Sequence, residues 1–161
     1  MQFNTEIFSQ FDKKWALLCA ETADSFNAMT IGWGGLGTLW MKPVATVYVR
    51  PDRYTYQFME KSDYFTISFY PEKFRGDLVT MGSVSGRDGN KLAQTAFTPK
   101  ALEQAVTFDQ AEVTLLCRKI YWQDLDADRI PPEVLRDIYA GAPAHRMYVG
   151  EVVDVIGAAA V

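Results

Sequence analysis

The sequence is poor in cysteine and contains no long apolar run. Its 161 residues include two cysteines, and neither stands in a CxxC or Cys/His spacing. We expect Cys19 and Cys117, each inside an apolar segment, to be buried thiols that pack as small hydrophobes. The apolar tail from Val152 to Val161 is interrupted by Asp154 and is shorter than the about 18 residues that span a membrane. The N-terminus lacks a secretory pattern. We therefore expect a soluble, cytoplasmic protein without membrane contact.

Basic clusters, metal-ligand patterns and a Walker-type loop are also missing. The net charge is −4 and no run of Lys and Arg stands out, which argues against a nucleic-acid partner. No GxxxxGK[ST] motif is present, so a nucleotide would have to be held in another way. His145 is the only histidine, and a lone histidine makes a poor transition-metal site. These absences leave a small organic ligand as the expected partner, with no metal.

What the sequence does contain is typical of one globular domain, residues 1–161, with 48% apolar and 22% charged residues. Alternating or β-branched and aromatic segments predict strands at Trp15–Glu21, Met29–Trp33, Val44–Arg50, Tyr64–Tyr70, Glu112–Trp122 and Arg146–Ile156. Helices are predicted at Thr55–Lys61, Glu72–Met81 and Pro132–Tyr139, and turns at 34–37, 82–89 and 131–132. Strands that outnumber helices favour a mainly antiparallel β-barrel with short helices at its edges.

The strand patterns also predict which side chains fill the barrel. Ala45, Val47 and Val49 share one face of their strand, and that face suits the interior. The aromatic residues of the other strands are expected inside as well: Trp15, Phe65, Phe69, Tyr121 and Trp122.

A first candidate ligand segment is Asn27-Ala28-Met29-Thr30, which opens a strand leading to the glycines at 34–37. A small residue and nearby glycines let backbone groups approach a planar heterocycle, and Asn27 and Thr30 can hydrogen-bond its polar edge. The alternative is an ordinary strand that enters a loop.

A second candidate is Arg50-Pro51-Asp52-Arg53-Tyr54-Thr55, where a strand that ends in arginine leads into a helix. Helix N-terminal N–H groups, guanidinium groups and a threonine hydroxyl all bind phosphate. Phe58 stands where a capping box needs Glu or Gln, so capping does not account for Thr55. The alternative is a solvated turn in which Asp52 pairs with one arginine.

A third candidate is the polar loop from Ser83 to Lys91, which includes Ser85. It could bring Lys91 to a phosphate or to the edge of a heterocycle, although such loops often only turn. His145 precedes the last predicted strand, either as a surface residue or as a substrate contact.

Together these segments resemble, in their order, the flavin reductase-like family of FMN-binding split barrels, which includes flavoredoxins and the reductase components of two-component monooxygenases. The resemblance covers roughly Trp15 to Val155. It is carried by Asn27–Thr30 with Trp33-Gly34, by Trp40–Val44, by Arg50–Thr55, by Ser85–Asp88 with Lys91, and by His145 before Gly150-Glu151-Val152.

The resemblance implies a Greek-key split barrel that forms a homodimer and binds FMN non-covalently near the subunit interface. It implies that Arg53, Thr55 and Lys91 hold the phosphate, with Arg50 and Ser85 also in the site, and that the ring lies along Asn27–Thr30. In the similar reductases, a histidine at the position of His145 lies near the nicotinamide. The Arg50–Thr55 run is closest to the flavoredoxin-like branch.

The expected activity is therefore hydride transfer from NADH or NADPH to FMN. The cofactor supplies the chemistry, so no catalytic acid–base pair need be present among the side chains. The alternatives are a flavoredoxin-like electron carrier or flavin sensor that a protein partner reduces, and a barrel that binds some other ligand.

Overall fold

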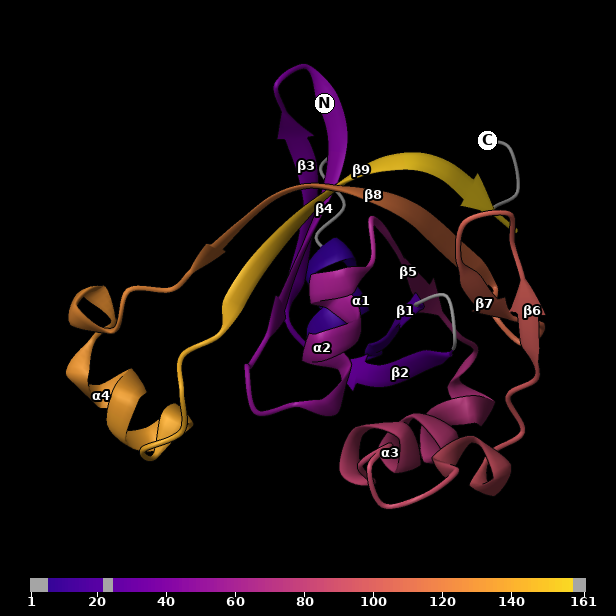
Figure 1. Ribbon diagram of the computed structural model, residues 1–161, viewed down its shortest axis with the longest axis horizontal. Helices are drawn as coiled ribbons and strands as arrows, with labels where there is room; N and C mark the ends of the chain where they lie inside the picture. Colours follow the sequence, from indigo (N-terminus) through magenta and orange to yellow (C-terminus); the bar gives the residue numbers. More distant parts are fainter. Residues whose placement is uncertain (1–5, 22–24, 158–161) are drawn as a thin grey trace.

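A seven-stranded antiparallel sheet dominates the computed structural model, which describes residues 6–21 and 25–157 (Figure 1). The strand order is β2-β1-β5-β8-β9-β4-β3, so β2 and β3 are the two edge strands. The strands are β1 (Ala16–Glu21), β2 (Phe26–Ile31), β3 (Gly34–Leu39), β4 (Lys42–Val49), β5 (Tyr64–Phe69), β8 (Val113–Asp124) and β9 (Arg146–Ile156). The mainly-β, split-barrel prediction is confirmed.

The barrel interior is filled by the face that the alternation predicted. Ala45, Val47 and Val49 are fully buried in β4, and they join Phe65 of β5 and Tyr148 of β9 in one core cluster. Burying residues of this size stabilises the fold by roughly 1.5–3 kcal/mol for each large apolar side chain.

A second core cluster lies on the outer side of β1 and β2. It contains Leu17, Cys19 and Ala28, and α3 (Arg75–Ser83) contributes Leu78 and Met81 to it. Cys19 and Cys117 are buried and free, as predicted. Burial raises the pKa of both thiols, so neither forms a thiolate readily.

The glycine run was wrongly predicted as a turn. Gly34, Gly35 and Gly37 lie in β3 and pair with β4, and the turn between the two strands falls at Trp40 and Met41. Both turn residues have positive φ, 50° and 60°, which is uncommon for bulky side chains. Gly32, Gly34 and Gly37 have GxGxxG spacing, but that fingerprint needs a strand-to-helix turn, and here the run leads from strand β2 into strand β3.

Two of the aromatic residues assigned to the barrel interior lie outside it. Tyr121 and Trp122 are 38% and 50% exposed, because β8 continues past the barrel with β9 toward an arm that bears α4 (Figure 1). Outside the barrel, Trp122 packs under the Arg146 guanidinium, 3.8 Å from the ring centroid. Phe65 is buried as predicted, whereas Phe69 and Trp15 are partly buried against the two cores.

The helices lie near their predicted positions, with shifted ends. Helix α2 spans Tyr54–Lys61, α3 follows a 3-10 turn at Glu72–Phe74, and the predicted helix at 132–139 is one α-helical turn, α4 (Pro132–Val134), followed by a π-turn (Leu135–Tyr139). Elements without a sequence prediction are α1 (Glu6–Asp12), the 3-10 turns Lys91–Gln94 and Ala127–Arg129, and the small hairpin of β6 (Pro99–Ala101) and β7 (Val106–Phe108). Within residues 6–21 and 25–157, no helix has the length and apolar character to cross a bilayer.

Candidate functional site

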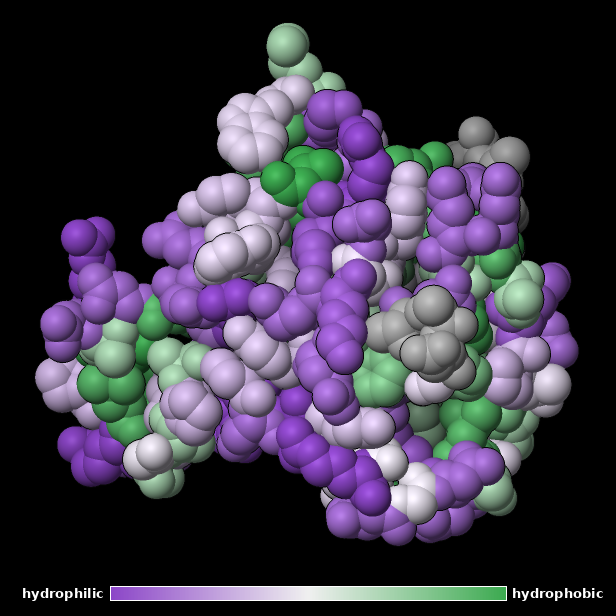
Figure 2. Space-filling model, viewed as in Figure 1, coloured by the Kyte–Doolittle hydropathy of each residue, from purple (hydrophilic) through white to green (hydrophobic). Residues whose placement is uncertain are grey.

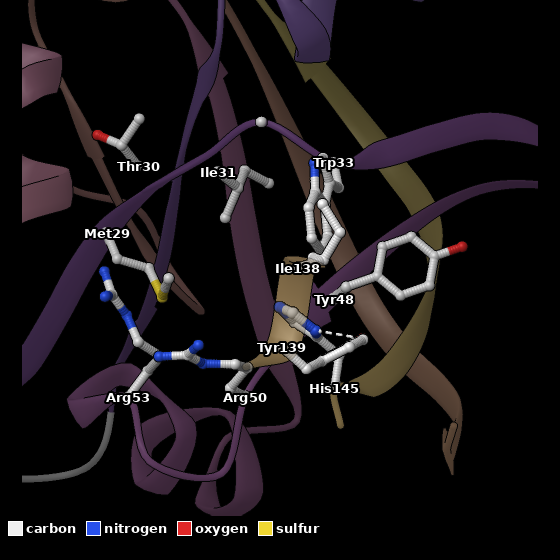
Figure 3. Close-up of a pocket in the computed structure, with 11 residues that line it drawn as sticks. Met29, Thr30, Ile31, Trp33, Tyr48, Arg50, Arg53, Ile138, Tyr139 and His145 are labelled. Atoms are coloured by element: carbon white, nitrogen blue, oxygen red, sulfur yellow. Dashed lines mark hydrogen bonds between the residues drawn. The ribbon is translucent and has the colours of Figure 1, made fainter. Parts of the chain in front are cut away.

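Two adjoining cavities lie beside edge strand β2, where the chain leaves β2 for β3. The aromatic cavity, about 270 Å³, is lined by residues 29–33, Tyr48, Arg50, Arg53, Ile138, Tyr139 and His145 (Figure 3). The cationic cavity, about 220 Å³, is lined by Asn27, Met29, Arg50, residues 52–55, 83–87 and Lys91. Met29, Arg50 and Arg53 line both cavities, so the two form one elongated site. Their combined size falls in the range of roughly 300–1,000 Å³ that is usual for cofactor sites.

The cationic cavity is built at the N-terminus of α2. Thr55 is 1% exposed, and its Oγ1 accepts a hydrogen bond from Asn27 Nδ2 at 2.7 Å. This bond uses an acceptor position of the hydroxyl and leaves its proton for another acceptor. The side chain and the first N–H groups of α2 therefore offer donors to an anion at this point.

Two cationic side chains, Arg53 and Lys91, line the cavity and contact the C-terminal end of α3. Arg53 donates from its guanidinium to the carbonyl of Gly82 at 2.8 Å, and Lys91 Nζ donates to the carbonyl of Met81 at 2.9 Å. Each side chain keeps further N–H donors beyond that bond. Lys91 is 6% exposed, and burial, together with the charge of Arg53, lowers its pKa to about 8. A buried ammonium without a carboxylate partner is destabilised until an anion arrives.

The loop after α3 closes the cationic cavity. Gly86 packs so closely that a Cβ there would lie 2.4 Å from Asn27 Oδ1 and 2.8 Å from the ring of Tyr54. Arg87 donates to the Asp52 carbonyl at 3.1 Å and lies over the Tyr54 ring. The cavity wall thus brings four cations and one carboxylate together in a chain of net charge −4. This excess favours an anionic group.

The alternative predicted for the 50–55 run, a turn in which Asp52 pairs with one arginine, is also present. Arg50 pairs with Asp52 through Nε and Oδ1 at 3.0 Å, as a solvated turn would require. Arg53 does not take part in that ion pair, because its guanidinium turns toward Gly82. Arg53 is therefore the arginine of this run that is better placed to bind an anion.

The aromatic cavity combines aromatic and aliphatic side chains with polar ones, among them Arg50, Arg53 and His145. His145 lies against Trp33, with ring centroids 5.0 Å apart, and its Nδ1 is 2.8 Å from the Tyr139 hydroxyl. Burial and the nearby charge of Arg50 lower the pKa of His145 to about 4, so the imidazole is neutral at physiological pH. A neutral imidazole beside the ring of Trp33 suits an uncharged planar ring.

The predicted strand residues have different positions. Met29 lines both cavities. Thr30 lines the aromatic one, but its side chain turns away toward α3, where the hydroxyl donates to the Leu78 carbonyl at 2.6 Å (Figure 3). Asn27 lines the cationic cavity, and the Ala28 side chain packs into the second core. Alternation along β2 explains this division, since neighbouring side chains point to opposite faces.

Of the other predicted residues, Arg50, Arg53, Thr55, Ser85, Lys91 and His145 all line the joined cavities. Ile138 and Tyr139 line the aromatic cavity but were not predicted from the sequence. Tyr139 ends the predicted 132–139 helix, and no local pattern marks it as a neighbour of His145. Arg87 was visible as a cation within the polar loop.

Comparison with known proteins supports one family. The flavin reductase-like domain matches residues 8–160, nearly the whole chain. No curated protein matches the sequence significantly.

Among solved structures, the chain is similar to a flavoredoxin from Methanosarcina acetivorans, with 19% identity, a TM-score of 0.71, and coverage of 98% of this chain and 75% of that one. It is also similar to an FMN-binding protein from Thermus thermophilus, with 18% identity, a TM-score of 0.70 and coverage of 96% and 76%. Component B of nitrilotriacetate monooxygenase from Bacillus cereus has 14% identity, a TM-score of 0.69 and coverage of 88% and 67%. The match of the domain over residues 8–160 shows that this chain belongs to the flavin reductase-like family.

Proposed function

We propose that the joined cavities bind FMN non-covalently. The observation that carries the proposal is the cationic cavity, where the buried Lys91 ammonium and Arg53 face the N-terminus of α2 without a carboxylate pairing either of them among the described residues. A phosphate monoester supplies the negative charge that this arrangement lacks. FMN-binding proteins among the structural neighbours are consistent with this ligand.

In this proposal the cationic cavity holds the phosphate. Arg53, Thr55 and Lys91 bind its oxygens, Ser85 and Arg87 lie at its margin, and Asn27 orients the Thr55 hydroxyl. Met29 and Thr30 line the place of the ring. Arg50 stands where the two cavities join, so it can contact either part of the ligand.

The aromatic cavity then leaves room beside the ring for a hydride donor, NADH or NADPH. Bound flavin supplies hydride acceptance and release. The protein binds both rings, excludes water with Trp33, Ile138 and Tyr139, and presents the neutral His145 to the second ligand. Its function is therefore that of a flavin-dependent oxidoreductase.

Anaerobic mixing of the FMN-loaded protein with NADH or NADPH tests this function. We expect loss of the absorbance of oxidised flavin with one of the two donors. A yellow protein that neither donor reduces would instead be a flavoredoxin-like electron carrier that depends on a redox partner protein. A colourless protein that remains so after FMN addition would contradict flavin binding itself.

The affinity for FMN is expected to fall as the pH rises above about 8. The phosphate binds the protonated form of Lys91, whose pKa in the free protein is about 8. Above that pH, binding requires uptake of a proton, which weakens it by up to about tenfold per pH unit. Titration calorimetry or fluorescence quenching at pH 7, 8 and 9 measures the slope.

Lys91→Met is the matched control for this slope, because it keeps the length of the side chain without the charge. The variant should bind FMN more weakly at pH 7, and its affinity should not fall more steeply above pH 8.

The stability of the free wild-type protein should rise with pH over the range in which its affinity for FMN falls. The folded-state pKa is below the usual value of about 10.5, so the free energy of unfolding rises with pH between about 8 and 10.5. If the wild-type Kd for FMN did not change with pH above 8, Lys91 would not be a phosphate-binding residue.

We also propose that the chain forms a homodimer. Large apolar side chains are exposed on the β3–β4 hairpin and on the outer part of β8: Leu36, Trp40, Met41, Tyr121 and Trp122. Met41 is 98% exposed, and the rings of Trp40 and Tyr121 pack edge to face with their centroids 6.2 Å apart. Figure 2 shows the hairpin tip as a projecting, partly apolar surface. Such a surface is unusual for a monomer.

Met41→Glu is expected to weaken the dimer. A charge placed within an apolar interface costs about 2 kcal/mol or more, which is roughly a thirtyfold higher dissociation constant. Sedimentation velocity over a range of concentrations measures the effect. Val79→Glu, at a 51% exposed position on α3, serves as the control and should leave the association unchanged. A wild-type chain that sediments as a monomer throughout would refute the proposal.

A further inference from the structure

The arm between β8 and β9 carries a side chain into the aromatic cavity that no sequence pattern predicted. The π-turn Leu135–Tyr139 ends at Ala140, which has a left-handed conformation with φ 48°. Its closing bond runs from the Ala140 N–H to the Leu135 carbonyl at 2.9 Å. A π-turn shifts the following residues relative to an α-helix and is often found at functional sites. Here it leaves Tyr139 6% exposed, with its ring against His145.

The contact between these two side chains is a hydrogen bond of 2.8 Å between the Tyr139 hydroxyl and His145 Nδ1, drawn as a dashed line in Figure 3. We infer that Tyr139 donates this bond and thereby fixes His145 as the tautomer with its proton on Nε2, so that the imidazole presents one N–H donor to a carbonyl group of the second ligand. Tyr139 is then a positioning residue. The ligand-binding part of this inference rests on the proposed function, and the tautomer does not.

The direction of the bond follows from the partners that each group has. If Nδ1–H donated to Tyr139, the hydroxyl proton would itself need an acceptor. Among residues 6–21 and 25–157, the only hydrogen bond found for this hydroxyl is the one to His145. A buried donor without an acceptor costs about 1–3 kcal/mol. Donation from Tyr139 to Nδ1 pairs the proton of this buried side chain and places the unpaired N–H on Nε2 of His145, a half-buried residue beside the cavity, where solvent or a ligand can accept it.

The charges around the imidazole keep it from carrying both protons. Burial disfavours the imidazolium form most, the charges of Arg50 and Arg53 also disfavour it, and Asp52 favours it. The two nitrogens of the ring point in different directions, so Nε2 faces away from Tyr139. Within the described part of the chain, no protein acceptor is found for Nε2. A neutral imidazole N–H can donate to a carbonyl or amide oxygen, such as that of the carboxamide group on a nicotinamide ring.

The protein has a single histidine, which makes the tautomer directly measurable. In ¹⁵N-labelled protein without added nicotinamide, long-range ¹H–¹⁵N spectra report which ring nitrogen is protonated. We expect an unprotonated, hydrogen-bonded Nδ1 and a protonated Nε2 near neutral pH. Protonation of Nδ1 in the wild type would overturn the inference, whether or not flavin binds.

Tyr139→Phe removes the hydroxyl and keeps the ring. We expect both nitrogen resonances to move toward the averaged positions of a tautomer mixture. Tyr48→Phe is the matched control, because Tyr48 lines the same cavity and Figure 3 shows its hydroxyl directed away from His145. A Tyr139→Phe spectrum that matches the wild type would show that Tyr139 does not set the tautomer.

A kinetic measurement then tests the ligand. With FMN-loaded protein, Tyr139→Phe should raise the KM for the nicotinamide from a few-fold to about tenfold, since one oriented hydrogen bond is weakened. The Kd for FMN should stay unchanged, because the phosphate residues are not altered. An equal loss of both affinities would indicate a packing role and overturn the assignment of Tyr139 to the second ligand.

Discussion

Replacing Arg53 and Thr55 together with alanine is expected to reduce FMN affinity by about 3–6 kcal/mol, or roughly 10²- to 10⁴-fold in Kd. In the proposed site each side chain donates a charge-assisted hydrogen bond to the phosphate, and each such bond contributes about 1.5–3 kcal/mol. Thr55 is fully buried at the start of α2, and Arg53, two residues earlier in the chain, lines the same cavity. Fluorescence titration of the free protein with FMN measures the loss.

Two controls separate loss of phosphate contacts from loss of structure. Thr55→Ser keeps the hydroxyl that accepts from Asn27 and should stay within a few-fold of the wild-type Kd. Arg129→Ala removes a guanidinium that is 86% exposed and is not part of either cavity lining, and it should have no effect. Riboflavin supplies a further comparison, because it lacks the phosphate. If the double variant weakened riboflavin as much as FMN, the phosphate assignment would be wrong.

The sequence was sufficient where a local pattern decides the structure. Alternation placed Ala45, Val47 and Val49 inside the barrel, because a strand that covers a core must present apolar side chains every second residue. The run from Arg50 to Thr55 likewise brought cations to a helix start, since the helix follows the strand directly. Contacts of this kind need no knowledge of distant segments.

The sequence was insufficient where an unusual turn, or a contact formed when the chain folds back on itself, decides the structure. Trp40 and Met41 form the β3–β4 turn with positive φ, while the nearby Gly35 and Gly37 lie in a strand with open space around them. Turn chemistry favours glycine at such φ values, so the sequence pointed to the wrong residues. Tyr139 meets His145 only because the arm folds back through a left-handed Ala140, which no sequence pattern signals.

Phe65→Ala is expected to destabilise the fold by about 3–5 kcal/mol. Phe65 is 1% exposed in β5, pairs with Cys117 of β8, and packs its ring over Gly150 of β9. Removing a buried ring loses its transfer free energy and leaves a cavity among three strands. Denaturant unfolding at one fixed protomer concentration measures the change, since association of the chain would shift apparent stability. Val79→Ala, at an exposed position, should change stability by no more than about 0.5 kcal/mol.

Gly150 provides a second test of the same packing. A Cβ at this position would lie 2.5 Å from Phe65 Cζ and 2.7 Å from Cys117 Cβ, so Gly150→Ala should cost about 1–3 kcal/mol through overpacking. In the Phe65→Ala background one of these two clashes disappears, while the Cys117 contact remains. The added cost of Gly150→Ala should therefore be smaller there than in the wild type. If the two effects added within about 0.3–0.5 kcal/mol, the ring would not be packing against Gly150, because independent sites behave in that way.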